Sequence, residues 1–305
     1  MAEKDIMEKI LLSYADVFAD CGNVLMYGGE HRLKAEEMQP APTESFYYAG
    51  GSGGREGMRH QFCDKSFYHV KEGKIKTQYI TENETQLERR QVLRKASYQG
   101  GAYRQQLEAG QEVYPVVSMV IDWTWKSSRI PLSLHELLRQ DGAGEEELEL
   151  ADDVKMKVFH MNNLPEDVRR KFTSDIGFVA DYLNEGSFEK RKDQKIIHLE
   201  ALCSMMEALT GDSRFTDRMG EMLKKQEGGR EVKMCEYIDM LEARGEARGK
   251  EKGKEIGENM LAALLIRLYA LGREGDVKLA LENKDARKEL YQEFTIAGKY
   301  QGPGA

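Results

Sequence analysis

Three acidic residues in the first third of the chain have the types and spacing of a divalent-cation site. Glu82 and Glu84 flank Asn83, and Asp64 precedes Glu82 by 18 positions. If a β-strand runs through Glu84, its two-residue period places both glutamates on one face, with Cα atoms about 7 Å apart. Because neighbouring carboxylates repel one another, a divalent cation such as Mg²⁺, or Mn²⁺ or Ca²⁺ in its place, is the simplest partner for them.

A turn between two predicted strands explains how Asp64 could join the glutamates. Residues 71–74 (KEGK) have the composition of a tight hairpin turn, and Gly73 lies midway between Asp64 and Glu82. In an antiparallel pair the two acids would face each other with Cβ atoms about 5 Å apart, which is destabilising without a cation. The alternative is that these acids end their strands in water, because E-x-E sequences and solvated acidic residues are common.

A cluster of basic residues follows the acidic pair, in a segment predicted to be helical. The segment contains few acids, although the chain as a whole is acidic. Its basic side chains recur at i,i+4 spacing, and a cationic helix beside a metal site could receive the phosphate backbone of DNA. The alternative is that these side chains only balance nearby acids and solvate the helix. The residues predicted to bind DNA are Arg90, Arg94, Lys95 and Arg104.

The elements that must position these side chains form a mixed α/β pattern. An amphipathic helix is predicted over residues 5–28. Residues 39–57 lose all periodicity, and their prolines and glycine-rich run indicate an exposed, mobile loop. The order of elements is α-β-β-α-β-β, which favours a mixed sheet. The strands and helix expected after the loop are His60–Val70, Lys74–Thr81, Glu88–Leu107, Tyr114–Ile121, which reads as buried on both faces, and Val154–Phe159.

Beyond about Asp175 the sequence becomes helical. A charged repeat over residues 241–258 has a glycine at every fourth position. It is either a solvated linker or frayed helix, or a helix whose glycine stripe packs closely against another helix, as in a dimer. The other helices predicted in this part of the chain are Phe178–Leu183, Ile196–Leu209, Met234–Leu241, Met260–Leu271 and Asp276–Phe294.

Composition excludes several classes of protein. The 305 residues carry 45 Lys and Arg against 53 Asp and Glu, so a broadly basic coat for nucleic acid is excluded, whereas a local basic patch is not. The N-terminus lacks a signal peptide, and the longest apolar stretch, Met260–Leu271, is too short to span a membrane. The four cysteines and six histidines show neither C-x-x-C nor H-E-x-x-H spacing, which argues against zinc. A reduced, cytoplasmic protein without a membrane partner is expected.

The order of these motifs resembles a known family, the recombination-promoting nucleases (Rpn) of bacteria, also described as PD-(D/E)XK nuclease family transposases. The resemblance covers about residues 4–258, and its motifs together are more specific than E-x-E alone. The segments that carry it are Lys4–Phe18, Ala41–Thr43, Asp64, Glu82–Glu84, Arg94, Tyr98–Arg104, Tyr114–Val117, Phe178–Tyr182 and Leu209–Phe215.

The resemblance implies an α/β fold and metal-dependent endonuclease cleavage of DNA phosphodiesters. Asp64 and Glu82 match the first and second metal-binding acids, and Asp16 matches an acidic position that could hold the cation from another side. With the carbonyl of Asn83, these residues would hold Mg²⁺. Glu84 would orient or deprotonate the attacking water.

The predicted organisation combines this resemblance with the helical pattern of the C-terminal part. It is a restriction-endonuclease-like (PD-(D/E)XK) mixed sheet core with flanking helices, followed by an α-helical C-terminal region. The expected divisions are a nuclease-like core, a helical extension, a charged glycine-repeat helix or linker, and a helical hairpin that could form a homo-oligomer. Their ranges are 1–185, 186–240, 241–258 and 259–305.

Two positions depart from the family's pattern. Glu84 stands where the superfamily has Lys and this family commonly has Gln, and Cys63 stands where relatives often have Arg. The first change adds a negative charge beside the scissile phosphate, and the second removes a cation. The alternative function is therefore a catalytically inactive DNA-binding or interaction module derived from a mobile-element protein.

Overall fold

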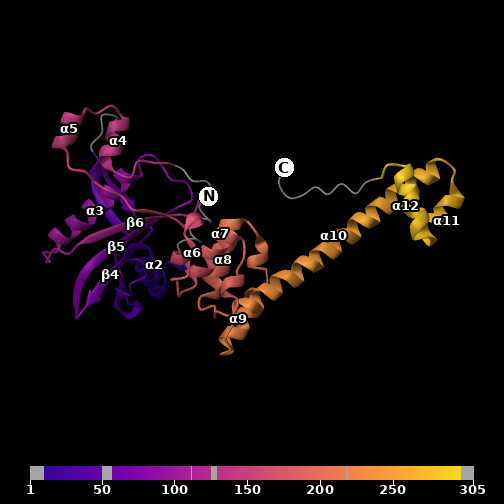
Figure 1. The fold of residues 1–305 in the computed structure, drawn as a ribbon, viewed down its shortest axis with the longest axis horizontal. Coiled ribbons are helices and arrows are strands. Elements are labelled where there is room, and N and C mark those ends of the chain that lie inside the picture. The colour runs from indigo at the N-terminus through magenta and orange to yellow at the C-terminus, as the bar shows by residue number, and fades with distance from the viewer. Residues whose placement is uncertain (1–9, 50–56, 111, 125–128, 218, 297–305) are drawn as a thin grey trace. The chain divides into compact units, whose positions relative to one another are not determined.

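The computed structural model describes residues 10–49, 57–110, 112–124, 129–217 and 219–296. The chain divides into two compact units, Met1–Tyr237 and Ile238–Ala305, and each is described by itself. The first unit contains the strands and the predicted acids, and the second is helical (Figure 1).

A five-stranded mixed sheet forms the centre of the first unit, in the order β1-β4-β5-β6-β7. The first three strands of this order pair antiparallel, and the last three pair parallel. The predicted mixed α/β class is therefore confirmed. The five strands are β1 (Met38–Pro40), β4 (Lys65–Lys71), β5 (Lys74–Glu84), β6 (Val116–Asp122) and β7 (Val158–His160).

A helix covers each face of this sheet. On one face, α3 (Gln91–Glu108) contributes Tyr98 and Ala102 to a buried cluster with Ile80 of β5 and Val116 of β6. On the other face, α2 (Ala15–Tyr27) packs Phe18 against Phe67 of β4, with ring centroids 4.4 Å apart. β6 is buried between these two helices, which explains its apolar run. The prediction that this strand is buried on both faces is confirmed.

The hairpin between β4 and β5 has the two-residue turn that the sequence predicts. Glu72 and Gly73 both have positive φ, 54° and 72°, and Lys71 pairs with Lys74. This backbone suits the right-handed twist of the two strands, and glycine adopts it without strain.

A β-bulge after His69 then shifts the register by one residue. With the turn alone, Asp64 would lie opposite Thr81. With the bulge, Lys65 pairs with Thr81, and Asp64, the next position along, lies opposite Glu82. The opposition of the two acids that the spacing predicts therefore depends on an irregularity that the spacing does not reveal.

Two predictions about the segment before β4 are wrong. The predicted loop over 39–57 contains strands, because β1 ends at Pro40 and β2 (Glu44–Ala49) follows it; residues 50–56 lie outside the described residues. The predicted strand His60–Val70 is two strands, β3 (Gly57–Phe62) and β4. The chain changes partners between them, since β3 pairs with β2 in a separate two-stranded sheet.

The predicted N-terminal helix over 5–28 is interrupted before α2. Tyr14 has an extended backbone, with φ −79° and ψ 129°, and α2 begins at the next residue. The ring of Tyr14 stacks on that of His198, with centroids 3.7 Å apart, and this contact accompanies the break. Residues 1–9 lie outside the described part of the chain.

Short helices complete the first unit. α7 and α8 confirm the helices predicted near Phe178 and Ile196. The sequence analysis did not predict the other short helices of this unit. The α-helices are α4 (Leu134–Gln140), α5 (Glu145–Leu150), α6 (Glu166–Arg169), α7 (Ile176–Glu185), α8 (Leu199–Thr210) and α9 (Met219–Glu227). The 3-10 helices are η1 (Ala35–Glu37), η2 (Met161–Asn163), η3 (Glu189–Arg191) and η4 (Ser213–Phe215).

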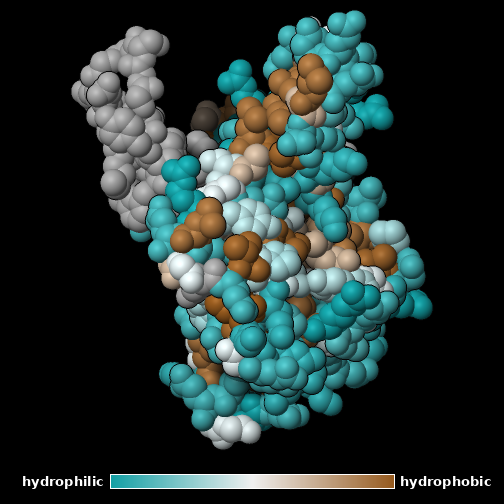
Figure 2. All heavy atoms as spheres, turned by 90° about the vertical axis from the view of Figure 1, so that its left-hand side faces the viewer, coloured by the Kyte–Doolittle hydropathy of each residue, from teal (hydrophilic) through white to brown (hydrophobic). Residues whose placement is uncertain are grey.

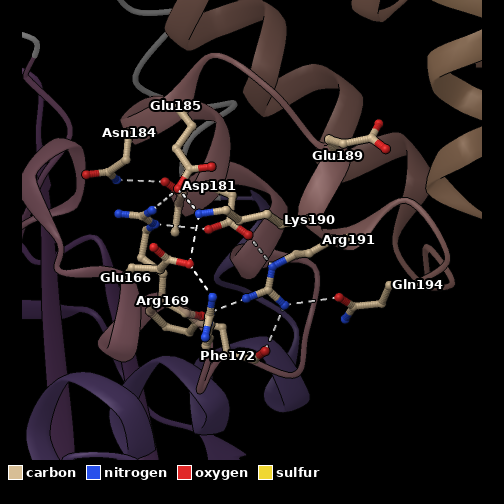
Figure 3. A network of polar contacts seen from close by, with 12 residues as sticks. Glu166, Arg169, Phe172, Asp181, Asn184, Glu185, Glu189, Lys190, Arg191 and Gln194 are labelled. Carbon is tan, nitrogen blue, oxygen red and sulfur yellow. Dashed lines mark hydrogen bonds and ion pairs between the residues drawn. The ribbon is translucent and has the colours of Figure 1, made fainter.

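A network of ion pairs joins α6, α7 and η3 (Figure 3). Arg169 and Arg191 bind the two carboxylate oxygens of the buried Asp181 at 3.0 and 2.6 Å. Arg191 also donates to the carbonyls of Phe172 and Arg169. The buried charges are therefore paired and hydrogen-bonded, which is the condition under which such a network holds a fold together.

The charged glycine repeat lies within one helix, α10 (Met234–Ala270), which begins in the first unit and continues in the second. This observation favours a helix over a linker for the repeat. A Cβ at Gly249, Gly253 or Gly257 would meet nothing within 4 Å, so these glycines pack against no described part of the chain. Their packing against a second copy stays a prediction.

The second unit has its own small core. Leu264 and Leu268 of α10 pack with Val277 and Ala280 of α11 (Glu274–Glu282) and with Leu290 of α12 (Lys284–Glu293). The single helix predicted over Asp276–Phe294 is wrong. Asn283 separates two helices, because its side chain accepts hydrogen bonds from the backbone N–H groups of Asp285 and Ala286 and so begins α12.

The surface of the first unit that carries α3, α4 and α5 is mainly hydrophilic, with hydrophobic side chains in separate spots (Figure 2). Leu93, Leu107 and Leu150 are among the exposed apolar residues of these helices. Single exposed apolar side chains are ordinary on folded proteins, so these three carry no argument for a docking surface. Within the described ranges, no helix combines the length and apolar character that a membrane span requires.

The position of Arg191 gives a testable prediction about stability. A Cβ at Gly177 on α7 would lie 2.6 Å from Cζ of Arg191, so Gly177→Ala must displace the guanidinium from its buried partners. We expect the variant to lose about 1–3 kcal/mol of unfolding free energy in urea titrations. The control, Gly220→Ala on α9, has open space around the added methyl and should be neutral or slightly stabilising. Equal stability of the two variants would contradict the structural role of Arg191.

Candidate active site

Asp64 and Glu82 come together at one end of the sheet, as the sequence predicts. Oδ2 of Asp64 accepts a hydrogen bond from the backbone N–H of Asn83 at 2.7 Å. This bond fixes the Asp64 carboxylate across from Glu82, on the face of β5 that α3 covers. The two acids are therefore held together by the hairpin register and by one main-chain contact.

The Glu82 carboxylate is almost fully buried, with 3% of the residue exposed. Its Oε2 accepts from Arg94 at 3.1 Å, whereas Oε1 has no hydrogen-bond partner among the described residues. Burial, followed by the charge of Asp64, raises the pKa of Glu82 from its ordinary value near 4.5 to about 8, against the opposing effect of Arg94. A carboxylate of this kind is costly to ionise without further positive charge.

Arg94 supplies part of that charge. Its guanidinium donates to Glu82 and, at 2.9 Å, to Oε1 of Glu84, while 41% of its side chain stays exposed. Gln91 donates to the same oxygen of Glu84 at 2.6 Å. Burial raises the pKa of Glu84 in spite of these two donors. Two of the three acids, Glu82 and Glu84, thus share one guanidinium.

Buried apolar side chains packed beside the acids explain why the acids have little contact with water. Cys63 and Tyr98 belong to the buried cluster that β5, β6 and α3 share. Burial, then the charges of Glu82 and Asp64, raises the pKa of the Cys63 thiol to about 12, so this side chain stays neutral. Cys63 is therefore a neutral group that withholds solvent from the acids and adds no charge.

Asn83 contributes its backbone and not its side chain. The amide oxygen Oδ1 accepts from Nε1 of Trp123 at 3.1 Å, and this pair faces away from Glu82 because side chains alternate along β5. The predicted role of the Asn83 carbonyl as a ligand stays a prediction. Over the described ranges, no group of three His, Cys, Asp or Glu side chains is arranged to hold a metal ion.

Asp16, the fourth predicted ligand, has a different set of contacts. Both of its carboxylate oxygens lie 2.9 Å from Nε2 of His198, the residue directly before α8. This contact joins α2 to the start of α8. Asp16 thus has a partner in the helical layer, and its part in binding a cation stays a prediction.

The predicted DNA-binding residues fall into two groups. Arg90 and Arg104 are exposed at opposite ends of α3. Arg94 is engaged with the acids, and Lys95 donates to the carbonyl of Lys155 at 2.7 Å. Burial, then the charge of Lys157, lowers the pKa of Lys95. A role of these side chains in DNA binding stays a prediction.

A buried carboxylate paired with a partly exposed histidine, which the sequence analysis missed, lies beside Glu84. Asp122 ends β6 and His160 ends β7, and the parallel register aligns Glu84, Asp122 and His160 across three strands. Nδ1 of His160 lies 2.6 Å from Oδ2 of Asp122. The available signal was a carboxylate directly after a buried apolar strand. Asp122 alone could have been singled out on this ground, because ligands of parallel sheets bind at the carboxyl ends of their strands.

Comparison with models of protein families, with curated proteins and with solved structures finds no match for this chain. The assignment of a function therefore depends on the geometry and chemistry of the residues just described.

The raised pKa of Glu82 predicts how stability depends on pH. The folded chain binds this proton more tightly than the unfolded chain, so the stabilisation from Glu82 is complete below pH 4.5 and is lost as pH rises through about 8. Glu82→Gln keeps the neutral form at every pH. In EDTA at pH 9 we expect it to exceed the parent's unfolding free energy, by up to about 5 kcal/mol, with little difference at pH 5.

The matched control is Glu108→Gln, at the exposed end of α3. Denaturant titrations of the three proteins at pH 5, 7 and 9 measure the effect. A difference between parent and Glu82→Gln that does not grow with pH would contradict the burial of an uncompensated carboxylate at this position.

Proposed function

We propose that this chain is a divalent-cation-dependent DNA endonuclease with a restriction-endonuclease-like core. The observation that carries the proposal is the Glu82 carboxylate, which is buried beside Asp64 with one oxygen that bonds to no described residue. Burial and the neighbouring Asp64 make ionisation of Glu82 costly, and Arg94 offsets that cost only in part. A doubly charged cation would remove that cost, and DNA would then be held against it.

The donor set fits the cation that the resemblance implies. Asp64 and Glu82 present carboxylate oxygens, the hard ligands that Mg²⁺ prefers, and Oε1 of Glu82 has a lone pair that no described group uses. These two residues would hold the ion, with the carbonyl of Asn83. The bound ion supplies polarisation of the phosphate and a lowered pKa of its water.

Glu84 would orient the attacking water. Gln91 and Arg94 both donate to Oε1, and no described residue donates to Oε2, which is therefore open to a water molecule. The raised pKa of Glu84, which burial causes, also brings it closer to the range of a general base.

Arg94 would exchange its partners when a cation and DNA are bound. Its side chain is partly exposed and reaches the acids from α3. Once a cation neutralises Glu82, the guanidinium can turn to a phosphate oxygen, a partner that suits its planar donors. Arg90, Lys95 and Arg104 on the same helix would contact the flanking backbone.

The fold is compatible with this function. The mixed sheet with a helix on each face agrees with the core that the resemblance implies. The acids also lie where β5 and its parallel neighbours end, the usual place for a ligand site in such sheets.

One observation favours a second candidate, the inactive DNA-binding or interaction module. Arg94 bridges Glu82 and Glu84, and so a side chain already occupies part of the space where a cation would act. If this bridge persists, the chain would bind DNA in a salt-sensitive way without cleaving it.

Plasmid nicking tests the proposed function. We expect the parent to nick supercoiled DNA with Mg²⁺ or Mn²⁺, and Asp64→Ala and Glu82→Ala to lose at least about 100-fold in rate. The reason is that a lost metal ligand forfeits several kcal/mol of transition-state stabilisation. Asp64→Asn and Glu82→Gln repeat the test with side chains of unchanged shape, and Glu108→Ala is the control.

Three outcomes of this experiment separate the candidates. Loss of nicking only in the Asp64 and Glu82 variants supports the endonuclease. Equal nicking by all proteins points to a contaminant or another site and contradicts it. Absence of nicking by the parent, together with DNA binding that weakens as salt increases, supports the inactive module.

A further inference from the structure

The pair of Asp122 and His160 has the geometry of a proton-transfer dyad, and the proposed function does not use it. Asp122 is fully buried, with no exposed surface. Its Oδ2 lies 2.6 Å from Nδ1 of His160, and its Oδ1 accepts from the backbone N–H of Thr124 at 3.0 Å. Both oxygens of the carboxylate are therefore held in place by the donors around them.

These contacts fix the tautomer of His160. Because Asp122 accepts the hydrogen on Nδ1, the other nitrogen, Nε2, carries the lone pair of the neutral ring and the exchangeable proton of the charged ring. Nε2 makes no hydrogen bond to a described residue, and 35% of the side chain is exposed. The buried carboxylate of Asp122 holds the imidazole ring in one orientation, as in other carboxylate–histidine pairs.

The register places this ring beside the acidic site. Glu84 pairs with Asp122, and Asp122 with His160, so the three side chains leave the same face of the sheet. With strands about 4.8 Å apart, the Cα atoms of Glu84 and His160 are about 10 Å apart. A phosphate that contacts Glu82 and Glu84 on one side could thus present its opposite side to the imidazole.

Hydrolysis of a phosphodiester needs a proton on that opposite side. The attacking and leaving oxygens lie roughly in line through phosphorus, so a leaving oxygen points away from the group that orients the water. An alkoxide leaves poorly unless it is protonated or neutralised as its bond to phosphorus breaks. The acidic site would act on the attacking side, and His160, two strands away from Glu84, can supply a proton on the leaving side.

We propose that His160 is the general acid of this reaction and that Asp122 is its positioning residue. The proposal rests on the proposed endonuclease function. The oxygen of water forms a bond to phosphorus while the bond from phosphorus to the leaving oxygen breaks. One proton of the water passes to Glu84 and then to solvent. The leaving oxygen takes the proton from Nε2 of His160, and the ring recovers a proton from solvent.

The test uses a substrate whose leaving atom needs no proton. Duplex DNA is prepared with the bridging oxygen of the scissile linkage replaced by sulfur, at the 3′ or the 5′ position that end-group analysis of the parent's products identifies. A thiolate leaves readily without protonation, so a variant that lacks only the acid should recover on this substrate. Rates are measured with Mn²⁺ for the parent, His160→Gln, Asp64→Ala and the control His31→Gln, whose histidine is exposed.

We expect His160→Gln to cleave ordinary DNA about 100-fold more slowly than the parent, within the range that general acids contribute. On the bridging-sulfur DNA its rate should lie within about 3-fold of the parent's. Asp64→Ala should be slow on both substrates, and His31→Gln should match the parent. Thermal unfolding of His160→Gln excludes a loss of fold as the cause.

Two outcomes would overturn the role of His160 while leaving the endonuclease intact. One is cleavage of ordinary DNA by His160→Gln at the parent's rate. The other is an equal loss on both substrates, which a merely structural link between β6 and β7 would produce. A parent that cleaves neither substrate would instead overturn the endonuclease function, and the role of His160 with it.

Discussion

The burial of Glu82 against Asp64 is the constraint on which the rest of this site depends. β5 carries Glu82 beneath α3, where the side chain has little access to solvent, and the bulged hairpin brings Asp64 to the same place. The main-chain N–H of Asn83 holds Asp64 there. Arg94 is the cation that approaches the buried carboxylate, and it is shared with Glu84. The fold thus buries a carboxylate that is costly to ionise, which a simple structural role does not require.

A second group of buried charges in the same unit shows what a balanced arrangement looks like. Asp181 has Arg169 on one oxygen and Arg191 on the other, and the two guanidinium groups also donate to carbonyls. Such complete pairing is expected where ions only stabilise a fold. Glu82 lacks it, because Oε1 has no partner in the described part of the chain. The contrast indicates that the two groups serve different purposes, since perturbed and underpaired acids occur preferentially at functional sites.

The sequence predicted the mixed sheet and the meeting of Asp64 with Glu82, for reasons that differ in strength. The long apolar run of β6 and the turn at Gly73 are local signals, and each was sufficient to predict its own element, the buried strand and the hairpin. The opposition of the acids also needed the bulge after His69, which leaves no mark in hydrophobic period. The strand at Pro40 and the break near Cys63 were missed because they depend on which strand pairs with which. The pair of Asp122 and His160 depends on the register of two parallel strands that are 38 residues apart, and so could not be read from spacing.

The most direct measurement of the central claim is the number of protons released when a cation binds. Calorimetric titration of Mn²⁺ into the metal-free protein, in buffers of different ionisation enthalpy, gives this number. Because the pKa of Glu82 is raised to about 8, the account predicts release of about one proton per ion at pH 7, falling toward zero by pH 9, and loss of the site in Glu82→Gln. Binding without proton release, or an absence of binding by the parent, would contradict it.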